Sequence, residues 1–192
     1  MTGKLDGKRI AILATDGVEE VELTEPRRAV TDEGAITEIV SLSDGEIQAM
    51  KGDLQPTNTY PVDRVASAAS ASDYDALLMP GGTVNADRLR MSPEVRSFVT
   101  DMFNSGKPVG AICHAPWTLV EADLVRGRTL TSYPSLRTDI RNAGGNVVDE
   151  EVVNDKGLVS SRNPDDLPAF CAKIVEEFAE GKHRVHHEGA TS

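Results

Sequence analysis

Residues 106–117 read GKPVGAICHAPW and place one of only two cysteines directly after an apolar run. The run 108–112 is short and follows a Gly-Lys-Pro turn, a pattern typical of a buried strand. After Cys113 the apolar residues take the spacing of a helix. We therefore expect Cys113 at a junction between a strand and a helix, a position at which a side chain can be pushed out of a sheet.

Short apolar runs alternate with helical spacing along the rest of the chain. We predict strands at 8–14, 36–42, 76–79, 108–112 and near 129–131, three short β runs within 146–161 of which the last is 158–161, an antiparallel hairpin within 45–62 attached to the main sheet, and helices at 21–33, 92–106, 114–123, 136–143 and 167–181. This alternation predicts an α/β fold, with a mostly parallel sheet covered by helices on both faces.

Length and composition limit the class of protein. A chain of 192 residues with 39% hydrophobic content suits one domain, residues 1–192, with a core of about 8–181 and a polar tail at 182–192. The net charge of −11 argues against a nucleic-acid partner, and no window is apolar enough to span a membrane. The first ten residues contain no apolar stretch typical of a secretion signal, and two distant cysteines predict no disulfide framework. We therefore expect a cytoplasmic protein.

The two cysteines stand in different settings. Cys113 is the centre of AICHA, where small residues two positions away on each side suit a sharp nucleophile elbow. A thiol at the start of a helix is expected to have a lowered pKa, because the helix dipole and free N–H groups favour the thiolate. The alternative is a buried cysteine that acts only as a small apolar residue. Cys171 lies on the apolar stripe of the last helix and is expected to be inert.

Three more positions could join Cys113 at the carboxyl ends of the strands, where open α/β sheets bind ligands. His114 is the only histidine outside the tail, where three further histidines give only a weak indication of metal binding. Glu22 precedes apolar Leu23 after the first strand and could point inward, although most acids in such a run are solvated. The N–H of Gly81 or Gly82 could form an oxyanion hole with that of His114.

Five segments of the chain resemble the PfpI family of intracellular proteases. They read VEEVEL, MPGG, AICHAPW, RGRTLTSYPSLRTDIRNAGGNVVDEEVV and LVSSRNPDDLPAF, and the resemblance runs from about residue 8 to about residue 180. The family belongs to a superfamily that includes the Parkinson-disease-linked protein deglycase. The resemblance implies a flavodoxin-like three-layer α/β sandwich with a nucleophile elbow and a small β-hairpin. It also implies a homodimer or a larger oligomer built from dimers.

The resemblance also implies roles for individual residues. Cys113 matches the nucleophile, and His114 matches the histidine next to it. Glu22 matches the glutamate that hydrogen-bonds the cysteine, and Gly82 matches the backbone donor of the oxyanion site. Asp87 matches, after a shift of one residue, an acid that a neighbouring subunit supplies to orient the histidine.

Other positions test how far the resemblance extends. Tyr133 matches a tyrosine near the site, and Ala115 replaces the glycine that usually follows the histidine, although alanine is still small enough for an elbow. Class I glutamine amidotransferases share a cysteine elbow but take their histidine and glutamate from a distant loop. Here the only late pair is His187-Glu188, in the polar tail, so that class is not favoured.

The function that the resemblance implies is that of a stress-response cysteine hydrolase of the peptidase, deglycase or glyoxalase type. Cys113 would attack a small electrophile or a peptide carbonyl, His114 would carry the proton, and no metal or organic cofactor is expected. The alternative is a non-enzymatic stress protein, either chaperone-like or a peroxide sensor, with an oxidisable Cys113. A sensor needs only a thiolate, whereas a hydrolase needs a proton carrier, so His114 favours the enzyme.

Overall fold

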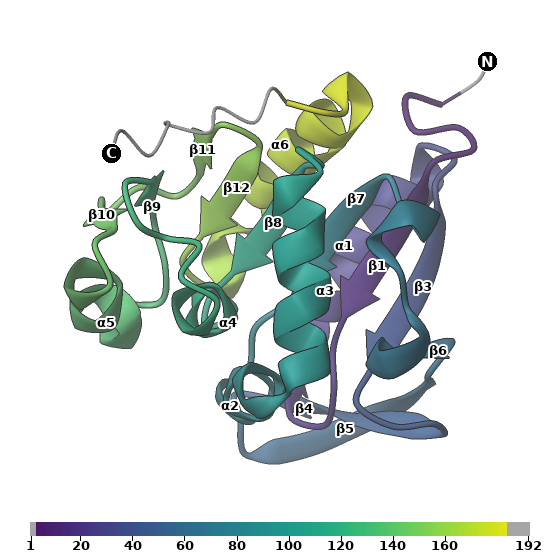
Figure 1. The fold of residues 1–192 in the computed structure, drawn as a ribbon. Coiled ribbons are helices and arrows are strands. Elements are labelled where there is room, and N and C mark those ends of the chain that lie inside the picture. The colour runs from purple at the N-terminus through teal and green to yellow at the C-terminus, as the bar shows by residue number, and fades with distance from the viewer. Residues whose placement is uncertain (1–2, 184–192) are drawn as a thin grey trace.

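The protein, in a computed structural model that describes residues 3–183, is built around one seven-stranded sheet (Figure 1). Neighbouring strands of this sheet are parallel, except for one pair at an edge of the sheet, which is antiparallel. The order is β11 (Val153–Asp155), β12 (Leu158–Ser161), β8 (Val109–Ile112), β7 (Ala76–Met79), β1 (Arg9–Leu13), β3 (Ile36–Ser41) and β6 (Arg64–Val65). The carboxyl ends of β1, β7, β8 and β12 therefore meet at one edge.

Helices cover both faces of this sheet and complete a flavodoxin-like three-layer sandwich. One face carries α1 (Glu20–Asp32) and α6 (Leu167–Glu180), which pack against each other. The other face carries α2 (Thr83–Met91), α3 (Pro93–Asn104), α4 (Pro116–Glu121) and α5 (Arg137–Asn142). Four short 3-10 helices lie at Ala66–Ala68, Ala71–Asp73, Pro134–Leu136 and Pro164–Asp166. The predicted α/β class and layer order are confirmed.

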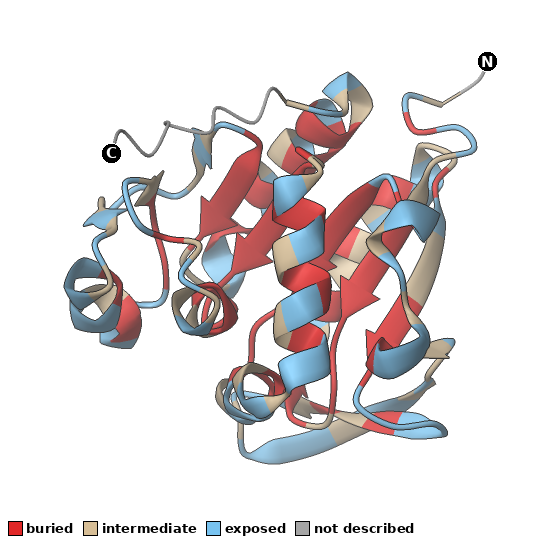
Figure 2. Cartoon of the chain, in the orientation of Figure 1, coloured by how far each residue is buried: buried red, intermediate tan, exposed pale blue. Residues whose placement is uncertain are grey.

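The core is divided by the sheet, as the alternation along β1 illustrates. Ile10 and Ile12 belong to the apolar cluster under α1 and α6, whereas Ala11 and Leu13 belong to the cluster under α3. Successive side chains of a strand point to opposite faces, so a central strand covered on both sides must be apolar throughout. Figure 2 shows the consequence: the central strands are mostly buried, whereas buried and exposed residues alternate along the helices.

The predicted hairpin exists, but the prediction that it joins the main sheet is wrong. β4 (Glu46–Lys51) and β5 (Gln55–Pro61) pair antiparallel and form a separate three-stranded sheet with β2 (Val18–Glu19). β2 directly follows β1 at the carboxyl edge, and the Glu19 carboxylate accepts the N–H of Gly52 from the hairpin turn at 2.9 Å. The hairpin is thereby held against the edge where the strands end. A second small sheet pairs β9 (Thr129–Leu130) with β10 (Asn146–Val147).

Two helices differ from the sequence-based expectation. The whole of α2 was not predicted, because TVNADRLRM carries few apolar residues and buries only Asn85, Ala86 and Leu89. The helix expected at 114–123 is shorter, since α4 begins at Pro116 and the residues before it form a turn. Most of the predicted tail lies outside the described residues. Within residues 3–183 no helix combines the length and apolar character needed to cross a membrane.

Candidate active site

Cys113 lies directly after β8 in a left-handed backbone conformation, with φ of 64°. Hydrogen bonds fix this residue from both sides, because its N–H donates to Ser161 O at 3.0 Å and its C=O accepts from Tyr133 N at 3.0 Å. Such a conformation costs a residue other than glycine about 1–2 kcal/mol and persists only where the surroundings impose it. The turn has the backbone geometry expected of an elbow, and Cys113 lines a cavity at this edge of the sheet, whereas its role as the nucleophile stays a prediction.

Glu22 lies in the first turn of α1 and points inward, fully buried, as the sequence suggested. Its Oε2 accepts the N–H of Gly81 at 2.8 Å, and the same carboxyl group lies against the Cys113 thiol. Burial raises the pKa of Glu22 to about 8, because a carboxylate loses its hydration there and these two hydrogen bonds only partly compensate. Glu22 therefore holds a proton at neutral pH and can donate it to the sulfur.

The thiol of Cys113 behaves differently from the sequence-based expectation. Burial and the charge of an ionised Glu22 raise its pKa, while the N–H groups of Gly82 and His114 act in the opposite direction. The predicted lowering by a helix terminus fails because α4 begins only at Pro116 and the sulfur is buried. Since Glu22 is protonated at neutral pH, its charge does not oppose a thiolate under those conditions. The two groups thus titrate as one coupled pair.

Two glycines let the loop after β7 approach the thiol. A Cβ at Gly81 would overlap Glu22 Oε2 and stand 2.6 Å from Cys113 Cβ. Gly82 has φ of +95°, and a Cβ there would overlap the carbonyl oxygen of Gly17. Neither position tolerates a side chain, and the Gly82 N–H lies within hydrogen-bonding reach of the sulfur. The role of this N–H in an oxyanion site stays a prediction.

His114 is held between two aromatic rings beside the thiol. Its Nδ1 lies 3.2 Å from Cys113 Sγ. Tyr133 stacks on the imidazole with ring centroids 4.5 Å apart, and Trp117 meets it edge-on at 5.5 Å. Burial lowers the pKa of His114, so the neutral ring is favoured at pH 7. The expectation that His114 and Tyr133 lie near Cys113 agrees with these distances, whereas their roles stay predictions.

Three residues near the imidazole were missed by the sequence analysis. Thr83 Oγ1 lies 3.3 Å and Ser135 Oγ 3.4 Å from Nε2 of His114. Asp53 accepts both the N–H of Thr83, at 2.8 Å, and its hydroxyl, at 2.7 Å. Asp53 belongs to a Gly-Asp turn between β4 and β5, where such residues are common for conformational reasons alone. Its sequence position therefore carried no functional signal.

Asp87 does not join this group of residues within the chain. It lies exposed on α2, one helical turn after Thr83 and on the same side of that helix. The role that the resemblance implied for it concerns a second subunit, so it stays a prediction.

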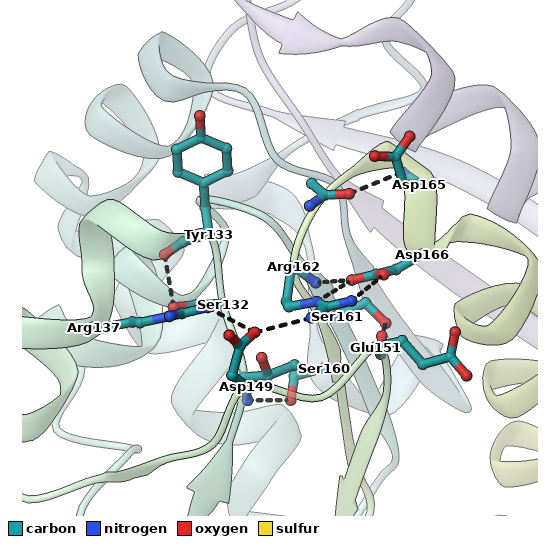
Figure 3. A network of polar contacts seen from close by, with 12 residues as sticks. Ser132, Tyr133, Arg137, Asp149, Glu151, Ser160, Ser161, Arg162, Asp165 and Asp166 are labelled. Carbon is teal, nitrogen blue, oxygen red and sulfur yellow. Dashed lines mark hydrogen bonds and ion pairs between the residues drawn. The ribbon is translucent and has the colours of Figure 1, made fainter.

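The assembled residues enclose a cavity of about 210 Å³. It is lined by Glu19, Glu22, Gly52, Asp53, Gly82, Cys113, His114, Tyr133 and Pro164. Pro164 follows Arg162 by two residues, and Figure 3 shows that Arg162 donates to Asp166 on one side and to Asp149 on the other. Asp149 also pairs with Arg137 at 2.8 Å, so the loops before β11 and after β12 are tied together. The cavity wall is therefore fixed by charged pairs.

Within residues 3–183, one group has ligand atoms close enough to hold a metal ion, and it lies outside the cavity. It comprises Glu177, Glu180 and His183 at the end of α6. The imidazole of His183 contacts the buried Glu177 carboxylate, and its backbone N–H donates to Gly106 O, which precedes β8. This group thus lies at the opposite edge of the sheet from Cys113.

Comparisons with known proteins give a consistent result. A family model described as DJ-1/PfpI family matches residues 8–177. Protein/nucleic acid deglycase 2 of Escherichia coli is 42% identical over 165 residues, or 85% of this chain and 93% of that protein. General stress protein 18 of Bacillus subtilis is 42% identical over 166 residues, with 85% and 94% covered. The crystal structure of Drosophila melanogaster DJ-1beta matches with a TM-score of 0.80 at 28% identity and 90% coverage of both chains.

Proposed function

The chain belongs to the DJ-1/PfpI family, and on that premise we propose that it is a cysteine-dependent enzyme acting on small carbonyl electrophiles, free or attached to protein side chains. The observation that carries this proposal is the size of the cavity around Cys113. Its volume of about 210 Å³ is below the roughly 300–1,000 Å³ of pockets that hold drug-sized ligands. Such a space suits a dicarbonyl or a single side-chain adduct better than an extended peptide.

The proposed chemistry starts at the sulfur. Cys113, as the thiolate, adds to the carbonyl carbon, and its proton passes to Nδ1 of His114. The N–H groups of Gly82 and His114 already reach the sulfur, so an oxygen on the attached carbon falls within their range. His114 then gives this proton to the oxygen, and the adduct is a hemithioacetal. For a dicarbonyl, His114 next moves the hydrogen of this carbon to the neighbouring carbonyl carbon, which leaves a thioester, and water cleaves the C–S bond to release the hydroxy acid and the free thiol. Glu22 keeps its proton and stabilises the thiolate as a hydrogen-bond donor.

A second copy of the chain belongs to this proposal. Asp87 is exposed on α2, the helix that also carries Thr83 beside His114. In a homodimer or an assembly of dimers, Asp87 of one chain would approach His114 of the other and stabilise its protonated form. The partners proposed are thus a second copy and a small electrophile. The acidic surface of the chain, with net charge −11, does not favour a nucleic acid.

The proposal is tested by incubating the wild type and Cys113→Ser with methylglyoxal, with a glycated thiol and with a fluorogenic peptide. Loss of dicarbonyl and release of free thiol are followed by absorbance, and cleavage by fluorescence. We expect turnover of the first two compounds, and loss of that turnover in Cys113→Ser. Cys171→Ser is the matched control and should keep full activity. Equal rates for wild type and Cys113→Ser would refute the proposal, whereas cleavage of the peptide alone would replace it with a peptidase.

The peroxide-sensor alternative is less well supported by the geometry. A sensor thiol needs no proton carrier, yet Nδ1 of His114 lies 3.2 Å from the sulfur. Cys113 in a sensor should be oxidised by substoichiometric peroxide, giving a mass increase of one or two oxygen atoms. If the protein turns over none of the three compounds and mass spectrometry shows this mass increase on Cys113, the second function is favoured.

A further inference from the structure

The hydroxyl of Thr83 has one proton, and its contacts decide where that proton points. Asp53 accepts the N–H of Thr83 at 2.8 Å through Oδ1 and the hydroxyl at 2.7 Å through Oδ2. An ionised carboxylate only accepts hydrogen bonds, so the hydroxyl proton must lie toward Asp53. What Thr83 Oγ1 offers to its other neighbour is therefore a lone pair.

That other neighbour is Nε2 of His114, at 3.3 Å. A lone pair on Thr83 Oγ1 is satisfied only if Nε2 carries a hydrogen. A neutral imidazole has one N–H, so Nδ1 is then bare, and Nδ1 is the atom that lies 3.2 Å from Cys113 Sγ. The opposite tautomer would set two lone pairs, on Thr83 Oγ1 and Nε2, against each other. Ser135 Oγ, at 3.4 Å from Nε2, can also accept this hydrogen.

We propose that Asp53, acting through Thr83, fixes the tautomer of His114 and makes Nδ1 the atom that receives the Cys113 proton. Asp53 and Thr83 are positioning residues, since neither touches the sulfur. The inference rests on the proposed function for its purpose, but the tautomer itself is a property of the free protein. It assigns to the β4–β5 hairpin a task in the site that its sequence did not reveal.

The hairpin is built to hold Asp53 in this place. Asp53 has a left-handed backbone with φ of 63°. Glu19 fixes the turn from the other side, because its carboxylate accepts the N–H of Gly52 at 2.9 Å and that of Asp53 at 3.4 Å. The contact with Thr83 N–H also places the carboxylate of Asp53 at the first turn of α2, where negative charge is favourable. Asp53 is thus held in place by Glu19 on one side and by the first turn of α2 on the other.

The test uses three variants and two measurements that need no substrate. Thr83→Val removes the hydroxyl at nearly constant shape, Thr83→Ser retains it, and Asp53→Asn removes the charge. Nitrogen-15 NMR of histidine-labelled protein at pH 7 distinguishes a protonated from a bare ring nitrogen, and the His114 signals are assigned by their loss in His114→Asn. The rate at which iodoacetamide alkylates Cys113, measured from pH 5 to pH 10, reports on transfer of the thiol proton.

We expect wild type and Thr83→Ser to show hydrogen on Nε2 and to be alkylated at rates within about twofold of each other. Thr83→Val should show a mixture of tautomers and a rate at pH 7 lower by about tenfold, the size of one lost hydrogen bond to a polar group. Asp53→Asn should lie between them. If Thr83→Val keeps hydrogen on Nε2 and the pH profile of Thr83→Ser, the inference is wrong. If the tautomer changes but no carbonyl compound is turned over by wild type, the proposed function fails while this inference stands.

Discussion

Glu22→Gln should make the protein more stable while impairing the site. The carboxyl group of Glu22 is fully buried between Gly81 and Cys113, and burial raises its pKa to about 8. The amide of glutamine has nearly the same shape, so its oxygen can still accept the Gly81 N–H. What the substitution removes is a group that ionises readily in the unfolded chain and reluctantly in the folded one.

The magnitude follows from this difference in pKa. The unfolded chain releases the Glu22 proton near the ordinary value of 4.5, and the folded chain only near 8. The stability of the wild type therefore falls as pH rises from 4.5 to 8, because only the unfolded state gains from ionisation in that range. At about 1.4 kcal/mol per pKa unit, the loss approaches roughly 5 kcal/mol above pH 8 and roughly 3 kcal/mol at pH 7. Replacing the O–H donor toward Cys113 with the weaker N–H donor of the amide returns about 1 kcal/mol.

The assay is urea denaturation of wild type and Glu22→Gln at pH 5, 6, 7, 8 and 9, at one protein concentration. We expect near-equal free energies of unfolding at pH 5 and a variant more stable by about 2 kcal/mol at pH 7 and about 4 kcal/mol at pH 9. Glu25→Gln, on the same helix but half-buried and paired with Arg28, is the matched control for removing a carboxylate. A difference between wild type and Glu22→Gln that stays constant across this range would refute a protonated Glu22 and its role as donor.

Three further predictions concern the thiols, the assembly and the stability of α6. Limiting iodoacetamide at pH 7 should label Cys113 before Cys171, because Nδ1 of His114 lies 3.2 Å from the Cys113 sulfur and can take its proton, and mass spectrometry that finds equal labelling would contradict the elbow assignment. Cys113→Ser and Asp87→Ala, each inactive alone, should regain partial activity after subunit exchange, and no recovery despite verified exchange would remove Asp87 from a partner's site. His183→Ala should lower the free energy of unfolding in urea by about 1 kcal/mol, because it removes the imidazole that contacts the buried Glu177 carboxylate.

The sequence predicted those parts of the site that follow directly from strand ends. Cys113 and Glu22 each come shortly after an apolar run, and parallel strands place such positions at one edge. The roles expected of Cys113 and Glu22 came from the resemblance to the PfpI family. The sign of the thiol pKa could not be predicted in the same way, since it depends on how deeply the sulfur is buried and on the distance to Glu22. Neither quantity can be read from periodicity.

Asp53 and Thr83 show a different limit of sequence reasoning. They are thirty residues apart and meet only because β2 turns the hairpin away from the main sheet and over the carboxyl edge. Nothing in a Gly-Asp turn distinguishes a carboxylate that caps a helix and orients a hydroxyl from one that merely suits the turn. The helix that carries Thr83 could not be predicted either, because the residues of this helix are mostly polar. Neither the turn with Asp53 nor the helix with Thr83 gave a sequence signal strong enough to predict the contact between them.

The unfavourable features of the protein gather around one sulfur atom, and this clustering argues for a function there. Cys113 occupies a left-handed conformation, Glu22 is a buried acid whose pKa is raised to about 8, and Gly81 must lack a side chain to admit both. Each feature lowers the stability of the fold, and an apolar residue at position 22 would remove the largest of these penalties. A cysteine with only a packing role would require none of them. Their coincidence with a small cavity and an adjacent imidazole is explained if the fold gives up stability to keep a reactive thiol.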